Sequence, residues 1–151
     1  MKTIETILFA TDFSTISDYA FDYAATLATT CTARLVVIHV VPHQEDLRSF
    51  YVPHIAFDEL DKEVEAGARK KMAEFTEKYL GRFPGATSCV VTGVPYEEIL
   101  NKAAEEKASL IVMGTHGRKG FEHFIFGSTA ERVVKTSLCP VLTVRPPQHH
   151  D

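Results

Sequence analysis

The sequence predicts a single α/β domain, in which a doubly wound, five-stranded parallel sheet carries helices on both faces. Short apolar segments alternate with helix-period segments along the chain, which is the pattern of repeated βαβ units. One of them, Arg34 to Val41, is almost continuously apolar, as expected for a parallel strand buried on both faces. The length of 151 residues suits one compact domain, expected over residues 1–145 and followed by a loose tail at 146–151.

Five short apolar segments are expected to be the strands. They are Ile4 to Ala10, Arg34 to Val41, Ala86 to Val91, Leu110 to Met113, and Pro140 to Val144. Connections between parallel strands are right-handed crossovers. We predict the strand order 3-2-1-4-5, in which the first and fourth strands are neighbours where the order reverses. Ligands of such folds bind at this reversal, outside the carboxyl ends of the strands.

Four segments with apolar residues at helical spacing are expected to be the helices. They run from Ser14 or Thr15 to about Cys31, from Phe57 to Leu80, from Pro95 onward, and from Ser128 to about Ser137. A hydroxyl cap begins the first helix, Gly81 caps the second, and Pro95 suits the first position of the third. The loop from Pro42 to Ala56 is too apolar for a solvated linker, and we expect it to pack over the ligand crevice or against a partner.

Charge and composition exclude several classes of function. The net charge of −4, without a basic stripe, argues against extended nucleic acid as a partner. No apolar run approaches the roughly 20 residues of a membrane helix. Three widely spaced cysteines, Cys31, Cys89 and Cys139, form no CxxC pair and are expected to be small buried hydrophobes. With no secretory leader pattern at the start, we expect a cytoplasmic location.

The glycine-rich segment from Met113 to Thr129 is the most informative part of the chain. It leads from an expected strand into an expected helix. Such a turn gathers backbone N–H groups at a helix N-terminus, which favours a phosphate group. The loop after the first strand, Ala10 to Ser14, should line the same crevice if the first and fourth strands are neighbours.

The spacing of this segment resembles the ATP-binding signature of the universal stress protein family. Two residues separate Gly114 from Gly117, nine separate Gly117 from Gly127, and Ser128 follows at once. The resemblance extends over almost the whole chain, through Ile-Leu-Phe-Ala-Thr-Asp at the start, His-Val-Val after the second strand, Gly-Val-Pro, and the closing Cys-Pro-Val-Leu-Thr-Val. Walker-type, dinucleotide and nucleophile-elbow motifs are absent.

The resemblance implies that ATP, or ADP or AMP, lies across the strand ends with Mg²⁺. Asp12 would bind a ribose hydroxyl or the metal ion, and Val40 would offer backbone groups to the adenine edge. The nucleotide-binding positions that it implies are Ala10, Thr11, Asp12, Val40, Met113, Gly114, Gly117, Gly127, Ser128 and Thr129. It also implies a homodimer that pairs the edge strand Val141 to Val144 with its copy.

Several of these residues also have a purely structural interpretation. Asp12 and Ser128 could each only cap a helix, and Gly114 could serve tight turning alone. Within the glycine-rich loop, Arg118 and Lys119 could approach the phosphates or remain solvated, and His116 and His123 carry no assigned catalytic role. The tail His149-His150-Asp151 could chelate a metal weakly, but disorder is the simpler expectation.

Three functions of different classes remain open at this level. The first is a nucleotide-binding regulatory or stress-response protein with slow or no hydrolysis, which signals to an unnamed protein partner. The second is a genuine ATPase or adenylate-forming enzyme that uses the same crevice. The third is an interaction module that keeps only the scaffold. The sequence shows no evident general base near the phosphate site, which favours the first.

Overall fold

The computed structural model describes residues 1–43, 54–116 and 126–147. Its centre is one five-stranded sheet in the order β3-β2-β1-β4-β5, and every pair of neighbouring strands is parallel. The strands are β1 (Thr6–Ala10), β2 (Arg34–Val41), β3 (Thr87–Thr92), β4 (Leu110–Gly114) and β5 (Val141–Val144). This confirms the predicted fold and strand order.

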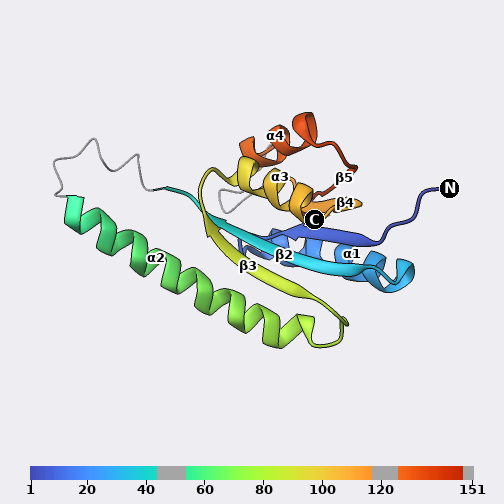
Figure 1. Ribbon diagram of the computed structural model, residues 1–151, viewed down its shortest axis with the longest axis horizontal. Helices are drawn as coiled ribbons and strands as arrows, with labels where there is room; N and C mark the ends of the chain where they lie inside the picture. The colour runs from blue at the N-terminus through green and yellow to red at the C-terminus, as the bar shows by residue number, and fades with distance from the viewer. Residues whose placement is uncertain (44–53, 117–125, 148–151) are drawn as a thin grey trace, which may run out of the picture.

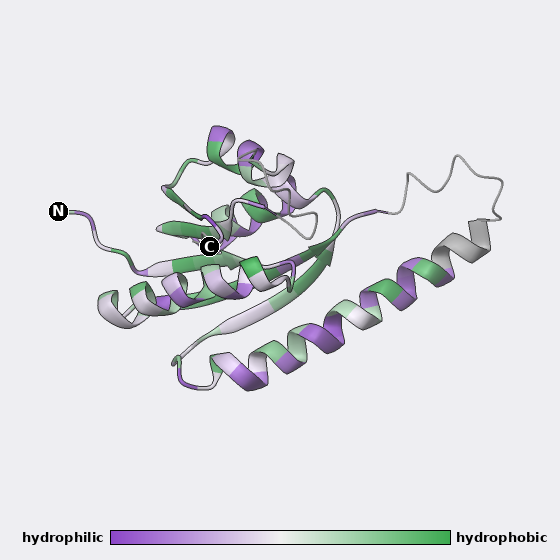
Figure 2. Ribbon diagram, turned by 180° about the vertical axis from the view of Figure 1, so that it is seen from behind, coloured by the Kyte–Doolittle hydropathy of each residue, from purple (hydrophilic) through white to green (hydrophobic). Residues whose placement is uncertain are grey.

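Helices cover both faces of the sheet (Figure 1). They are α1 (Thr15–Cys31), α2 (His54–Phe75), α3 (Pro95–Glu105) and α4 (Ser128–Thr136). Side chains of α1 and α2 share one buried cluster with Ile7 and Phe9 of β1. Side chains of α3 and α4 share a second cluster with Leu8. Because successive strand residues point to opposite faces, both faces of β1 are apolar, and the strands are mainly green in Figure 2.

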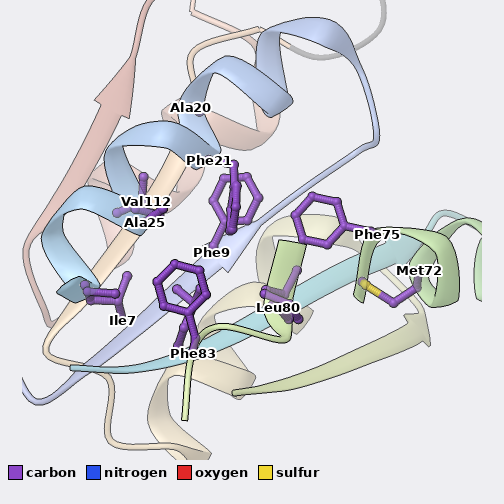
Figure 3. Close-up of a cluster of buried hydrophobic side chains, with 14 of the residues drawn as sticks. Ile7, Phe9, Ala20, Phe21, Ala25, Met72, Phe75, Leu80, Phe83 and Val112 are labelled. Atoms are coloured by element: carbon purple, nitrogen blue, oxygen red, sulfur yellow. The ribbon is translucent and has the colours of Figure 1, made fainter. Parts of the chain in front are cut away.

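The first cluster is rich in aromatic rings (Figure 3). The Phe21 ring of α1 lies 5.2 Å from Phe9 of β1 and 5.0 Å from Phe75 of α2, centroid to centroid. It also lies 6.4 Å from Phe83, which follows the second helix. These tilted and edge-on arrangements are favourable for aromatic pairs. They hold α1 and the end of α2 against the same face of the sheet.

The second helix begins earlier than expected, and although it ends at Leu80 as expected, its last turn has a different geometry. It begins at His54, three residues before the expected Phe57, and it finishes in a π-helical turn, Thr76–Leu80. Gly81 is the C-cap, as predicted, but its φ of −61° is right-handed rather than the left-handed conformation typical of a glycine cap. The π turn brings Phe75 and Leu80 into the same core, which periodicity at 3.6 residues does not anticipate.

The expectation of buried cysteines was wrong for Cys31, which is exposed, while Cys89 and Cys139 are partly buried. Cys31 is the last residue of α1, and the last buried residue of this helix is Ala28, so its final three residues are all exposed. Among the described residues, no helix is long and apolar enough to cross a membrane. The strand β5 lies at one edge of the sheet, as predicted.

Candidate functional site

A cleft of about 830 Å³ opens at the carboxyl ends of β1, β2 and β4. It lies at the reversal of strand order, since β1 is flanked by β2 on one side and β4 on the other. All the predicted binding residues that the structure describes line it. They are Ala10, Thr11, Asp12, Val40, Met113, Gly114, Gly127, Ser128 and Thr129. The tenth, Gly117, lies outside the described residues, as do Arg118, Lys119, His123 and residues 148–151.

Thr11, the first residue after β1, organises the loop that enters the cleft. Its side chain is buried and its Oγ1 accepts hydrogen bonds from the Ser17 hydroxyl at 2.7 Å and the Phe13 amide at 3.0 Å. Its own amide donates to the carbonyl of Ile38 on β2 at 2.9 Å. The loop is therefore tied both to the first turn of α1 and to the neighbouring strand, which limits its freedom without any ligand present.

The Asp12 carboxylate turns back on its own loop at the mouth of the cleft. Its Oδ1 accepts from the Ser14 amide at 3.0 Å, which is the hydrogen bond of an Asx turn. The cap of α1 is a different residue, because the Ser14 hydroxyl accepts from the Ser17 amide at 3.1 Å. Asp12 is thus not the helix cap, and a capping role alone does not explain an aspartate at this position.

The strand β4 ends against α1 at Gly114. A Cβ placed on Gly114 would lie 3.2 Å from Cγ2 of Ile16 and 3.5 Å from the carbonyl oxygen of His116. Because the chain segments approach so closely, packing by itself favours glycine at this position, whether or not Gly114 also contacts a ligand. After it, the buried Thr115 donates its amide to Val144 of β5 at 3.0 Å and accepts from the Gly127 amide at 2.7 Å. The bond between Gly127 and Thr115 joins the two ends of the glycine-rich segment, and the bond to Val144 ties that segment to β5.

Helix α4 begins at the cleft with its first turn uncapped by a side chain. Gly127 occupies the cap position, and no side-chain hydrogen bond closes the turn. Ser128 is the first residue inside the helix, so the interpretation of Ser128 as the cap was wrong. The first N–H groups of a helix lack intrahelical acceptors and carry partial positive charge. Ser128 and Thr129 line the cleft together with Ala130, which is the geometry of an anion site.

One wall of the cleft was missed by sequence reasoning. Residues on one face of α2 line it, namely Val64, Gly67, Ala68 and Lys71. Their spacing of three and four residues is that of a single helix face. A glycine inside a helix is unfavourable relative to alanine, and no atom lies within 4 Å of a Cβ built on Gly67. A glycine inside an expected helix is therefore the feature of the sequence that could have indicated that this face of α2 lines the cleft.

The second missed residue is His39 of β2, which also lines the cleft. Its Nδ1 lies 2.7 Å from the carbonyl oxygen of Thr11, and its ring packs on the Phe13 ring with centroids 4.5 Å apart. The motif His-Val-Val was recognised in the sequence, but nothing in a single strand reveals which loop the imidazole contacts. Only the pairing of β2 with β1 brings them together.

Charges are few in the described part of the cleft. Asp12 is its one carboxylate and Lys71 its one lysine or arginine side chain. Burial raises the pKa of the nearby Asp18 carboxyl, as do the negative charges of Asp12 and Asp22, while Lys78 opposes the change. No group of three or more histidine, cysteine or acidic side chains among the described residues could hold a metal by itself. A cation held by Asp12 would need further oxygen ligands, such as those of water or of a bound molecule.

Comparison with known proteins adds a family likeness over nearly the whole chain. A family model for the universal stress protein family matches residues 3–145. Universal stress protein YxiE of Bacillus subtilis is 36% identical over 144 residues, which cover 92% of this chain and 97% of YxiE. The solved structure of protein MJ0577, from Methanocaldococcus jannaschii, matches with a TM-score of 0.85 at 27% identity. That match covers 98% of this chain and 100% of the MJ0577 chain.

A crystal structure of a universal stress protein in complex with cAMP is also similar. It matches with a TM-score of 0.61 at 25% identity and covers 95% of this chain and 98% of that one. The likeness therefore includes a relative with an adenine nucleotide bound.

Proposed function

This chain belongs to the universal stress protein family, and from that premise we propose that it is a stress-response protein that binds an adenine nucleotide in the cleft. ATP is the proposed ligand, with ADP and AMP as its shorter forms. One observation carries the proposal: the start of α4 and the Thr11–Asp12 loop, more than 100 residues apart in sequence, line a single cleft. The relative in complex with cAMP supports the same ligand class.

The phosphates would lie at the start of α4. Amide N–H groups there have no helical acceptor, and the hydroxyls of Ser128 and Thr129 add donors at the same place. Lys71 lines the same cleft from α2 and would add a positive charge to it. Gly127 leaves the approach to these amides clear of a side chain. This end of the cleft therefore suits a group with several negatively charged oxygens.

The nucleoside would occupy the apolar part of the cleft. Val40 and Ile38 of β2, Met113 of β4 and Ile99 of α3 line it, and all four belong to the second core cluster. Such a surface suits the faces of a purine ring, while the backbone of Val40 offers hydrogen bonds to its edge. Asp12, which lines the same cleft, would accept a hydrogen bond from a ribose hydroxyl or hold a cation.

The donor set at Asp12 fits a magnesium ion that arrives with the nucleotide. Mg²⁺ in proteins is commonly held by one or two carboxylates, with phosphate oxygens and waters completing the octahedron. The described cleft offers one carboxylate, Asp12, in the same cleft as the start of α4. The ion would neutralise repulsion between that carboxylate and the phosphates. Asp12 would therefore bind more tightly to the magnesium complex than to the free nucleotide.

Hydrolysis is proposed to be slow or absent, so that the bound nucleotide acts as a regulatory ligand and not as a substrate. A carboxylate that coordinates a cation accepts a proton poorly, because the cation stabilises its ionised form. Asp12 is the only carboxylate in the described part of the cleft, which leaves the role of base without an acidic residue there. A turnover above roughly 1 per second, a typical enzymatic rate, would instead favour the ATPase or adenylate-forming alternative.

We also propose that two copies of the chain form a homodimer through β5. A further protein partner would recognise the nucleotide-bound form of the protein. The strand β5 lies at a sheet edge, and edge strands invite pairing. Leu138, just before it, is fully exposed, and Val134 at the end of α4 is about half exposed. An isologous pairing of two β5 strands would place these apolar side chains near the interface.

Calorimetric titration tests the nucleotide proposal. ATP, AMP and cAMP are titrated into the full chain with and without Mg²⁺, and bound nucleotide in the purified protein is identified by mass spectrometry after denaturation. We expect ATP to bind, and Asp12→Asn to lose the gain in affinity that Mg²⁺ gives. Asp22→Asn, an exposed carboxylate of α1 outside the cleft, is the matched control and should behave as the unchanged protein. Absence of binding by every adenine compound would reject the proposal.

A further inference from the structure

The loop that carries Asp12 is held by a side chain from a different strand. The carbonyl oxygen of Thr11 is 2.7 Å from Nδ1 of His39. A carbonyl oxygen can only accept, so Nδ1 of His39 must carry the hydrogen in this contact. The same imidazole packs on the Phe13 ring, at 4.5 Å between centroids and 40° between planes. One histidine therefore contacts the residue before Asp12 and the residue after it.

The conformation of this loop is one that the chain would not adopt without support. Phe13 has a φ of +62°, in the left-handed region that bulky residues rarely occupy. Such backbone strain persists only where the surroundings over-determine it. Here the Phe13 amide is bound to Thr11 Oγ1 and the Phe13 ring is bound to His39. If the histidine contact is removed, we expect Phe13 to be held less firmly and the Asp12 carboxylate to lose its fixed orientation.

We propose that His39 is a positioning residue, which sets the orientation of the Asp12 carboxylate toward the nucleotide-bound cation. Its imidazole does this from β2, by holding Thr11 through a hydrogen bond and Phe13 through ring packing. This inference rests on the proposed nucleotide function. It adds a specific consequence: His39 controls the magnesium-dependent part of nucleotide affinity, while the part due to the α4 amides is independent of it.

Two substitutions of His39 distinguish the effect of its hydrogen bond to Thr11 from the effect of its side-chain volume. His39→Leu fills a similar space but has no donor. His39→Asn keeps an amide N–H near the position of Nδ1 and should restore much of the contact with Thr11. His43→Leu is the matched control, since His43 is an exposed histidine two residues beyond the end of the same strand and does not line the cleft.

The experiment measures ATP affinity by calorimetry with and without Mg²⁺ for these variants, alone and combined with Asp12→Asn. Outer-shell partners of metal ligands are typically worth about 10- to 100-fold in metal affinity, so His39→Leu should lose roughly tenfold of the gain from Mg²⁺. Affinity without Mg²⁺ should change little, and His39→Asn should recover most of the loss. In the Asp12→Asn background, His39→Leu should have no further effect, because the group that it positions is gone.

Hydrogen exchange of the Phe13 and Ser14 amides in the nucleotide-free protein supplies a second measurement, and both amides should exchange faster in His39→Leu. An equal loss of affinity with and without Mg²⁺, or an undiminished loss in the Asp12→Asn background, would overturn the inference. The inference would also be overturned if both amides exchanged in His39→Leu at the same rate as in the unsubstituted protein. This result would count even if the unsubstituted protein bound no nucleotide. Absence of nucleotide binding by the unchanged protein rejects the proposed function, whereas normal binding with an unaltered response in His39→Leu rejects only the role of His39.

Discussion

Phe9 of β1 lies opposite Val112 of β4 in parallel register. Because the two strands run in the same direction, the residues that follow each of them emerge at the same edge of the sheet. Asp12 follows Phe9 by three residues, and Thr115 follows Val112 by three residues. Both Asp12 and Thr115 line the cleft. The register of this single pair thus brings the aspartate loop and the glycine-rich segment together.

Gly114 should tolerate no side chain, whereas Gly67 should tolerate one. A Cβ on Gly114 would press on Ile16 at 3.2 Å, while one on Gly67 meets no atom within 4 Å. We expect Gly114→Val to lower the free energy of unfolding by about 1–3 kcal/mol through overpacking. Gly67→Ala, inside α2, should raise it by about 0.5–1 kcal/mol. Urea denaturation measures both, and a Gly114→Val protein as stable as the unchanged chain would contradict the packing argument.

Lys71 should strengthen the binding of nucleotides in proportion to their negative charge. Its side chain is exposed and reaches the cleft from α2, so its attraction to phosphates is that of a partly screened ion pair, about 0.5–1 kcal/mol. We therefore expect Lys71→Ala to weaken ATP binding about two- to fivefold and AMP binding less, with the difference shrinking at high salt. Lys70→Ala, which alters an exposed neighbour outside the cleft, serves as the control. An equal effect of both substitutions would show that position in the cleft is unimportant.

Glu106 should stabilise the fold at neutral pH and lose that effect in acid. Hydrogen bonds from Arg34, at 2.6 Å, and from Lys102 lower the pKa of its carboxyl below the ordinary value of 4.5. A lowered folded-state pKa gives stability that is present above the unfolded value and disappears as the pH falls through the folded value. Arg34 and Glu106 are partly exposed, so the effect should be below about 1 kcal/mol.

The test compares the unfolding free energies of Glu106→Gln and the unchanged chain at pH 7 and at pH values below 4. The difference between them should be largest at pH 7 and shrink in acid. Glu97→Gln, an exposed position on α3, provides the comparison for a glutamate without these partners. A difference for Glu106→Gln that stayed constant with pH would mean that the charge of Glu106 contributes nothing.

The β5 edge should mediate the proposed homodimer through backbone groups of Thr143. In this ladder Ile111 donates to Pro140 and Thr115 donates to Val144. The alternation of a parallel ladder then directs the N–H of Thr143 away from β4. Thr143→Pro should remove an outward donor, leave the β4 pairing in place, and shift the protein toward monomer in sedimentation equilibrium. Leu142 is a poorer choice because it packs against the first core cluster. An unchanged mass for a folded Thr143→Pro protein would exclude this interface.

Local patterns in the sequence determined most of the secondary structure. The apolar run of β2, the hydroxyl cap at Ser14 and the proline at the start of α3 all express preferences of neighbouring residues. The π turn at Thr76–Leu80 lies beyond such rules, because it arises from packing Phe75 and Leu80 into one aromatic core. The same holds for the exposure of Cys31, which depends on where the packing of α1 against the rest of the chain ends, after Ala28.

The sequence by itself also determined which residues carry the proposed chemistry, since glycine spacing and an aspartate after the first strand are visible without a fold. The tertiary structure alone decided which side chains surround them. Contacts such as His39 with Thr11, or the α2 face from Val64 to Lys71 against the strand ends, join segments whose neighbourhood depends on strand pairing and helix packing. Those contacts are long-range, and no periodicity within either segment encodes its partner.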